Sequence, residues 1–105
     1  MEQKELLARV DHTLLRQDAS WEEIRALCDD GMRYGCASVC IPASYVKDAA
    51  AYLDGKLPVC TVIGFPHGAH LTEVKVFEAK KAMEDGCREL DMVLAIGKLK
   101  AGEYD

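Results

Sequence analysis

An aspartate lies inside one of the apolar segments of the sequence, at a position where a carboxylate is energetically unfavourable. Residues 89–94 are strand-like, and strand alternation places Asp91 on the face opposite Leu90 and Met92. Burial of a carboxylate in a parallel strand costs free energy unless the group is paired or hydrogen-bonded. Asp91 is therefore a candidate for acid–base chemistry. A salt bridge to a neighbouring strand, or the cap of a loop, is the structural alternative.

Other strand-like segments carry polar side chains in the same alternating arrangement. Asp11 and Thr13 share one face of the first such segment, and Ser38 and Cys40 share one face of segment 37–41. At least three strands thus have one apolar face and one face of small or ionisable groups. An outer wall packed on helices and an inner wall lining a site would give this pattern. For Asp11, a turn or cap role at the strand end is the alternative.

The histidines and one glycine-containing loop each allow two interpretations. His12, next to Asp11, is either a base or a packing residue. His67 and His70 have a spacing that suits metal ligation on a helix, but they follow a turn, and we expect no metal site. The loop 64–68 is either part of a site at a strand end or turn chemistry alone. No dinucleotide or P-loop motif occurs, and no cofactor is expected.

The elements that must position these groups alternate along the chain. Ser20 and Glu23 form a capping-box pattern, and Gly35 ends the helix that they begin. Thr72 is the expected cap of the third helix. The predicted helices are 20–35, 43–53 and 72–86, and the predicted strands are 9–15, 37–41, 59–63 and 89–94. The expected buried stripe of the third helix is Val76, Ala79, Ala82 and Met83.

Strands that alternate with helices predict an α/β fold with a parallel βαβαβαβ order. Two architectures have this order: the N-terminal half of a TIM (β/α)₈ barrel, with all helices outside, and a small open doubly wound, flavodoxin-like sheet. Because a whole barrel needs about 250 residues, residues 1–105 form a single partial barrel domain in the first case. The tail 98–105 stops where a fourth helix is expected to begin.

The composition of the chain favours a globular protein and argues against several other classes. The chain has 105 residues, a net charge of −5, 50% hydrophobic residues and 30% charged residues. This profile favours a globular domain; the acidic balance argues against nucleic-acid binding, and no apolar run is long enough to span a membrane. The odd count of 5 cysteines and the charged N-terminus predict buried thiols in a reducing cytoplasm.

The segments that carry these residues resemble deoxyribose-phosphate aldolase, in family order and over nearly the whole chain. They are 11–15, 37–41, 60–69, 72–79 and 89–93. The resemblance implies a (β/α)₈ barrel and a class I, Schiff-base aldolase. Its substrate would be 2-deoxy-D-ribose 5-phosphate, cleaved to D-glyceraldehyde 3-phosphate and acetaldehyde. It also implies that Asp91 is the aspartate of the proton relay, that Asp11 and Thr13 lie near the site, and that Cys40 faces the substrate pocket.

One part of the family pattern has no match. A class I aldolase needs a lysine whose amine attacks the carbonyl, and the resemblance implies that this lysine lies on the sixth strand. No segment here matches it. Lys98 and Lys100 fall in the tail, and Lys47, Lys75, Lys80 and Lys81 fall on predicted helices, which in a barrel face away from the interior. We therefore expect little or no aldolase activity from this chain alone.

A second hypothesis is a structural half-barrel without catalytic activity. Its exposed first and fourth strand edges would favour association into a homo-oligomer. A third is that a separate C-terminal chain completes the site. In the aldolase hypotheses the partner is a small phosphorylated sugar, with no nucleic acid and no membrane.

Overall fold

A four-stranded parallel sheet forms the centre of the computed structural model, which describes residues 2–103. Its strands are β1 (Asp11–Thr13), β2 (Ser38–Ile41), β3 (Val59–Ile63) and β4 (Glu89–Met92). They lie in the order β1-β2-β3-β4, and every neighbouring pair is parallel. The four predicted strands are confirmed, and the first and last are shorter than expected.

Helices connect the strands and extend the chain at both ends. They are α1 (Gln3–Leu7), α2 (Trp21–Tyr34), the 3₁₀ turn η1 (Ala43–Tyr45), α3 (Val46–Leu53), α4 (Thr72–Glu84) and α5 (Ile96–Lys100). The second predicted helix is thus divided into η1 and α3. The short helices α1 and α5 were not predicted, and neither has a buried residue. Within residues 2–103, no helix combines the length and apolarity that crossing a membrane requires.

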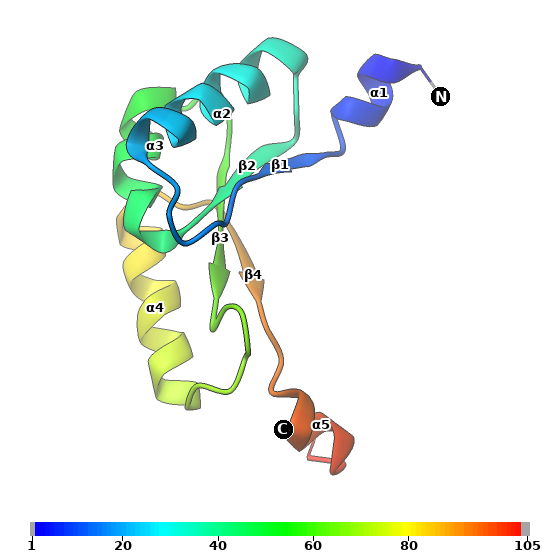
Figure 1. Ribbon diagram of the computed structural model, residues 1–105, viewed down its shortest axis with the longest axis vertical. Helices are drawn as coiled ribbons and strands as arrows, with labels where there is room; N and C mark the ends of the chain where they lie inside the picture. The colour runs from blue at the N-terminus through cyan, green and yellow to red at the C-terminus, as the bar shows by residue number, and fades with distance from the viewer. Residues whose placement is uncertain (1, 104–105) are drawn as a thin grey trace.

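The connecting helices α2, α3 and α4 all lie on one side of the sheet, and α1 lies beyond the start of β1, away from α3 and α4 (Figure 1). The main core is formed between these helices and the strand residues that face them. It includes Val39, Ile41 and Val59 of the sheet, Ile24, Leu27 and Cys28 of α2, and Val46, Ala49 and Leu53 of α3. A doubly wound sheet has helices on both faces and reverses its strand order. That alternative is wrong: the sequential order and one-sided cover are those of half a (β/α)₈ barrel.

The predicted boundaries of α2 are confirmed in detail. The Ser20 hydroxyl accepts a hydrogen bond from the Glu23 amide at 3.3 Å, and the Ser20 amide donates to Glu23 Oε1 at 3.2 Å. This reciprocal pair is the capping box. Gly35 ends the helix with φ +65°, a left-handed conformation that glycine adopts without steric cost.

Two expectations for α4 are wrong. Thr72 is the first helical residue, and the cap position is Leu71, which makes no side-chain capping bond. Of the expected buried stripe only Ala82 is buried; Val76 and Met83 are 46% and 53% exposed. The physical reason is that α4 packs mainly over β3, so its flank beside β4 has no covering element among the described residues.

We predict that Ser20→Ala lowers the free energy of unfolding by about 1 kcal/mol, because it removes the oxygen that satisfies a free amide of α2. Urea denaturation monitored by circular dichroism measures the change. Ser44→Ala is the matched control, because Ser44 is exposed in η1 and is the N-cap of neither η1 nor α3. Equal stabilities of the two variants would contradict the capping role.

Candidate functional site

The register of the sheet places the polar residues singled out from the sequence on one face. Asp11 pairs with Ser38, Thr13 with Cys40, and Cys40 with Cys60. Paired residues in a parallel sheet point to the same side, and the side alternates along each strand. We call the side opposite the helices the inward face; it comprises Asp11, Thr13, Ser38, Cys40, Cys60, Val62, Glu89 and Asp91. The predicted separation is confirmed in β2, where Val39 and Ile41 pack under the helices while Ser38 and Cys40 face inward. The outward side of β4 is not covered by a helix among residues 2–103.

The middle of the inward face is a small buried cluster of Cys40, Cys60 and Val62, against which Leu15 packs. Burial raises the pKa of the Cys40 thiol, and the nearby carboxylates of Asp91 and Asp11 raise it further. Burial likewise raises the pKa of Cys60. Both thiols are therefore protonated at neutral pH and are poor nucleophiles. All five cysteines are free and buried, as predicted.

A hydrogen-bonded pair joins β1 to β2 on the inward face. The Ser38 hydroxyl donates to Asp11 Oδ1 at 2.6 Å, and Ser38 itself is fully buried. The Thr13 hydroxyl donates to the backbone carbonyl of Asp11 at 2.7 Å. Asp11 is exposed to solvent, so its carboxylate is held in place yet open to a ligand on this side. Sequence reasoning placed Ser38 on this face but missed its role as the partner of Asp11.

Asp91 lies on the inward face of β4, paired in register with Val62. The expectation that it is buried is wrong, because every residue of β4 is exposed. Among the strands of residues 2–103, β4 lies at an edge of the sheet and pairs with β3 alone. The outward residues Leu90 and Met92, on the face expected to pack on helices, are 41% and 55% exposed for the same reason. Asp91 takes part in none of the ion pairs found among residues 2–103.

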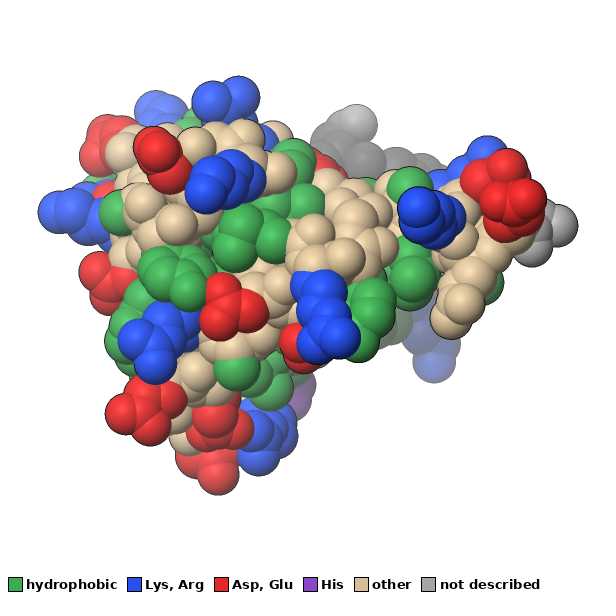
Figure 2. Space-filling view, turned by 90° about the horizontal axis from the view of Figure 1, so that it is seen from above, with side chains coloured by type: hydrophobic (Ala, Val, Ile, Leu, Met, Phe, Trp, Pro, Cys, Tyr) green, Lys and Arg blue, Asp and Glu red, His purple; other side chains and the backbone are tan. Residues whose placement is uncertain are grey.

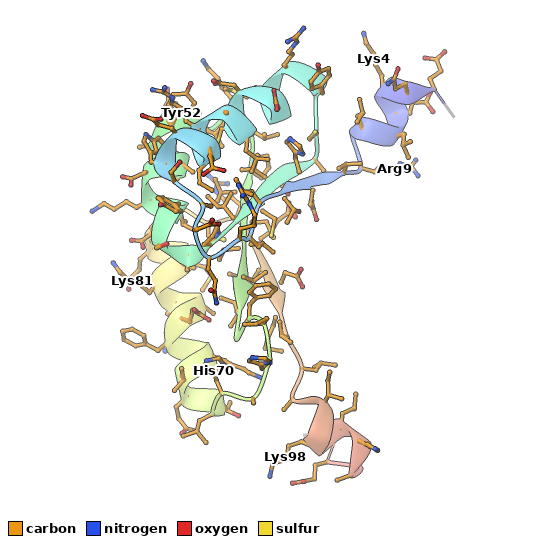
Figure 3. All side chains as sticks on the ribbon, viewed as in Figure 1. Lys4, Arg9, Tyr52, His70, Lys81 and Lys98 are labelled. Carbon is orange, nitrogen blue, oxygen red and sulfur yellow. The ribbon has the colours of Figure 1, made fainter. Side chains whose placement is uncertain are left out.

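The histidines lie away from the inward face. His12 points to the helix side, where its Nε2 is 3.9 Å from Asp30 Oδ2 of α2, so the structure favours its packing role. His67 and His70 are exposed in the loop between β3 and α4, and Figure 3 shows His70 near the start of α4. Within the described part of the chain, no group of three or more His, Cys, Asp or Glu residues is arranged to hold a metal ion.

A pocket of about 340 Å³ opens at the carboxyl ends of β1, β2 and β3. The segments that follow these strands form it; its lining is Leu15, Arg16, Gln17, Ala19, Pro42, Ser44, Tyr45, Phe65 and Pro66. Parallel α/β sheets bind their ligands at this edge. A larger hollow of about 450 Å³ lies between η1 and α4, on the helix side and away from the inward face. The smaller pocket is therefore the better candidate for a ligand site that uses the residues of the inward face.

The loop that follows β3 is folded tightly against the end of β4. The Gly68 amide donates to the Gly64 carbonyl at 2.7 Å, and both glycines have positive φ. A Cβ atom on Gly68 would lie 2.2 Å from the Leu94 carbonyl oxygen, so only glycine allows this approach. The loop is thus both a turn and a part of the strand edge where the pocket lies.

No lysine of the chain lies on a strand; each is in a helix or a loop. Figure 3 shows Lys4, Lys81 and Lys98 on α1, α4 and α5, away from the sheet. Lys75 differs, because its side chain is half-buried and its Nζ donates to the Val93 carbonyl at 2.9 Å. The periodicity of α4 gave no signal for this contact, which joins residues 18 positions apart.

The chain is similar to deoxyribose-phosphate aldolases over its full length. It is 53% identical over 105 residues to the deoxyribose-phosphate aldolase of Streptococcus pyogenes serotype M5, and it spans 47% of that protein. No protein-family model matches. The resemblance indicated by the sequence motifs is confirmed, and the chain spans about half the length of the curated relatives that it matches.

Solved structures agree with the sequence comparison. A Coccidioides immitis protein assigned as a deoxyribose-phosphate aldolase superimposes with a TM-score of 0.94 and 40% identity, over 99% of this chain and 42% of that one. The deoxyribose phosphate aldolase of Aeropyrum pernix, described as tetrameric, gives a TM-score of 0.87 and 32% identity, over 91% of this chain and 42% of that one.

We predict that Ser38→Ala destabilises the protein by about 1.5–3 kcal/mol, because the buried hydroxyl donates to a charged group. Asp11→Ala removes the other partner. In the double variant the two losses should be less than additive by about 1 kcal/mol or more. Urea denaturation of the four proteins gives this coupling energy. Strict additivity would show that the 2.6 Å contact does not stabilise the β1–β2 pair.

Proposed function

We propose that the inward face forms one wall of a class I aldolase pocket. The observation that carries the proposal is the placement of Asp11, Thr13, Cys40 and Asp91 on a single face of the sheet. A pocket at the carboxyl edge adjoins this face through Leu15, which lines the pocket and packs against the buried cluster of the inward face. The similarity to deoxyribose-phosphate aldolases supports the same conclusion. The substrate would be 2-deoxy-D-ribose 5-phosphate, and the products D-glyceraldehyde 3-phosphate and acetaldehyde.

Each residue of this wall has a chemical role in the proposal. Asp91 moves protons at the carbinolamine and enamine stages, for which a carboxylate with access to the reacting atoms is suited. Asp11, held by Ser38, and Thr13 offer oxygen atoms to the hydroxyl groups of the sugar. Cys40 is a protonated, buried thiol in the middle of the inward face. Leu15, which lines the pocket, packs against the cluster that contains this thiol. A cytoplasmic location and a cofactor-free reaction complete the proposal.

We further propose that this 105-residue chain by itself has little or no aldolase activity. Schiff-base chemistry needs an amine that reaches the carbonyl carbon and is free to lose its proton. The lysines of the chain lie on helices and loops, and the half-buried Lys75 directs its amine to a backbone carbonyl. None therefore extends from the inward face toward a substrate beside Asp91.

Borohydride trapping tests this proposal. We expect that acetaldehyde with sodium borohydride leaves no stoichiometric ethyl group on a specific lysine, as measured by intact mass and peptide mapping. We also expect no release of D-glyceraldehyde 3-phosphate from 2-deoxy-D-ribose 5-phosphate. A specific adduct with turnover would contradict the proposed inactivity. Lys75→Met is the informative control, because loss of that adduct in this variant would identify Lys75 as the nucleophile.

A second candidate function is that of a self-associating half-barrel, and the exposure of β4 favours it. One edge of this strand has no hydrogen-bonding neighbour among residues 2–103, and Met92 and Leu94 expose apolar surface beside it. Unpaired strand edges and exposed apolar patches promote association. In this proposal the edges of β1 and β4 meet between copies of the chain.

The oligomeric state tests the second candidate. We expect light scattering coupled to size exclusion to show a mass that rises with protein concentration. Met92→Lys should shift the protein toward monomer, because it places a charge beside the β4 edge. Phe77→Lys is the control, since Phe77 is 72% exposed on α4, away from that edge. A monodisperse monomer at every concentration would contradict association through the edges.

A further inference from the structure

Two side chains of α4 reach past the helix to the carboxyl ends of different strands. Lys75 Nζ donates to the carbonyl of Val93, the residue directly after β4, at 2.9 Å. Glu78 Oε1 accepts from the amide of Gly64, the residue directly after β3, at 2.8 Å. Both contacts are partly buried. One helix therefore holds the last backbone groups of two neighbouring strands.

These contacts are unusual for a lysine and a glutamate spaced three residues apart on a helix. Such side chains are neighbours, and opposite charges at this spacing ordinarily pair with each other at the surface. Lys75 and Glu78 form no such pair among the ion pairs found in residues 2–103. Each charge instead binds a backbone group, and hydrogen bonds that involve a charged partner are among the stronger ones.

The backbone around the two contacts is shaped to admit them. A Cβ atom on Gly64 would lie 2.9 Å from Lys75 Cε and 3.4 Å from its Cδ and Cγ, so the lysine stem crosses directly over the glycine. The Val93 amide donates to the Ile63 carbonyl at 2.9 Å. Val93 is thus bound through its amide to the end of β3 and through its carbonyl to α4.

We propose that Lys75 and Glu78 are positioning residues that fix the carboxyl end of β4, and with it Asp91, against β3. The inference rests on the proposed function, in which Asp91 is the proton-relay group. Asp91 is two residues before Val93, on an edge strand with a neighbour on one side only. Among residues 2–103 no second strand pairs with β4, so Lys75 and the Ile63 carbonyl hold its end, and Glu78 holds the adjoining end of β3. A shift of about 1 Å at a reacting group is enough to impair catalysis strongly.

The experiment uses the 105-residue chain and nuclear magnetic resonance. Lys75→Met keeps the methylene stem and removes the donor, Lys75→Arg retains a donor, and Glu78→Gln retains an acceptor without the charge. Lys80→Met is the matched control, because Lys80 is exposed on the same helix. The two measurements are amide hydrogen exchange and the ¹³C chemical shift of the Asp91 carboxyl carbon.

We expect Lys75→Met to raise hydrogen exchange at the Val93 amide about tenfold. The reason is that the Val93 carbonyl loses its bond to a charged donor, so the end of β4 opens more often. Exchange at the Leu14 amide, which binds Cys40 on the far side of the sheet, should change little. The Asp91 carboxyl resonance should shift, and Lys75→Arg should restore both signals. Glu78→Gln should raise exchange at Gly64 and shift the same Asp91 resonance, which tests the inference even if Lys75→Met does not fold.

Three results would overturn the inference: an effect of Lys75→Met no larger than that of Lys80→Met, an equal rise in exchange at all amides, or an unmoved Asp91 resonance. An equal rise would mean that Lys75 supports global stability alone. Addition of 2-deoxy-D-ribose 5-phosphate separates this inference from the proposed function. Absence of any shift at Asp91 on adding the sugar would count against the aldolase pocket, while the exchange data would still decide the role of Lys75 and Glu78.

Discussion

The alternation of side chains across a parallel sheet with helices on one face is the constraint on which the rest of this structure depends. The register that pairs Cys40 with Cys60 places Val39, Ile41 and Val59 under the helices. A slip of one residue would exchange the two faces and expose the core. The same register collects the thiols and carboxylates on the inward face. The same strand register therefore determines both the packing of the core and the assembly of the candidate site.

The strand least covered in this arrangement is β4. An interior strand has two hydrogen-bonding neighbours and a helix above it, whereas β4 has β3 alone and lies largely outside the cover of α4. This single fact accounts for the exposure of Asp91, of the apolar residues that follow it, and of the flank of α4. It also explains why the two proposed functions meet at one place, since a solvent-open Asp91 and a free strand edge belong to the same strand.

At the carboxyl edge of the sheet, α4 and the loop before it contact the residues that follow β3 and β4. Lys75 and Glu78 satisfy backbone groups that follow β4 and β3, and Gly68 allows the loop to contact the Leu94 carbonyl. Lys75 binds a backbone carbonyl just after the edge strand β4, and Glu78 binds the first amide after the interior strand β3. Through these contacts α4, which covers the outer side of the sheet, is connected to the candidate site.

The sequence by itself determined the local elements and their order. The capping box at Ser20, the left-handed Gly35 and the βαβ alternation depend on residues close together in the chain, and their periodicity is visible without a structure. The motifs also identified the family that the chain resembles, and alternation correctly placed Asp11, Thr13, Cys40 and Asp91 on one kind of face.

Only the tertiary structure decided which architecture these elements form and how open the site is. The pairing of Ser38 with Asp11 and the contact of Lys75 with Val93 join residues that are distant in sequence. The exposure of Asp91 depends on which strand lies at an edge, and the placement of the helices on one face depends on how the whole sheet is connected. A local pattern reports which side of a strand a residue occupies. Whether that side is covered is determined by neighbours that the pattern does not contain.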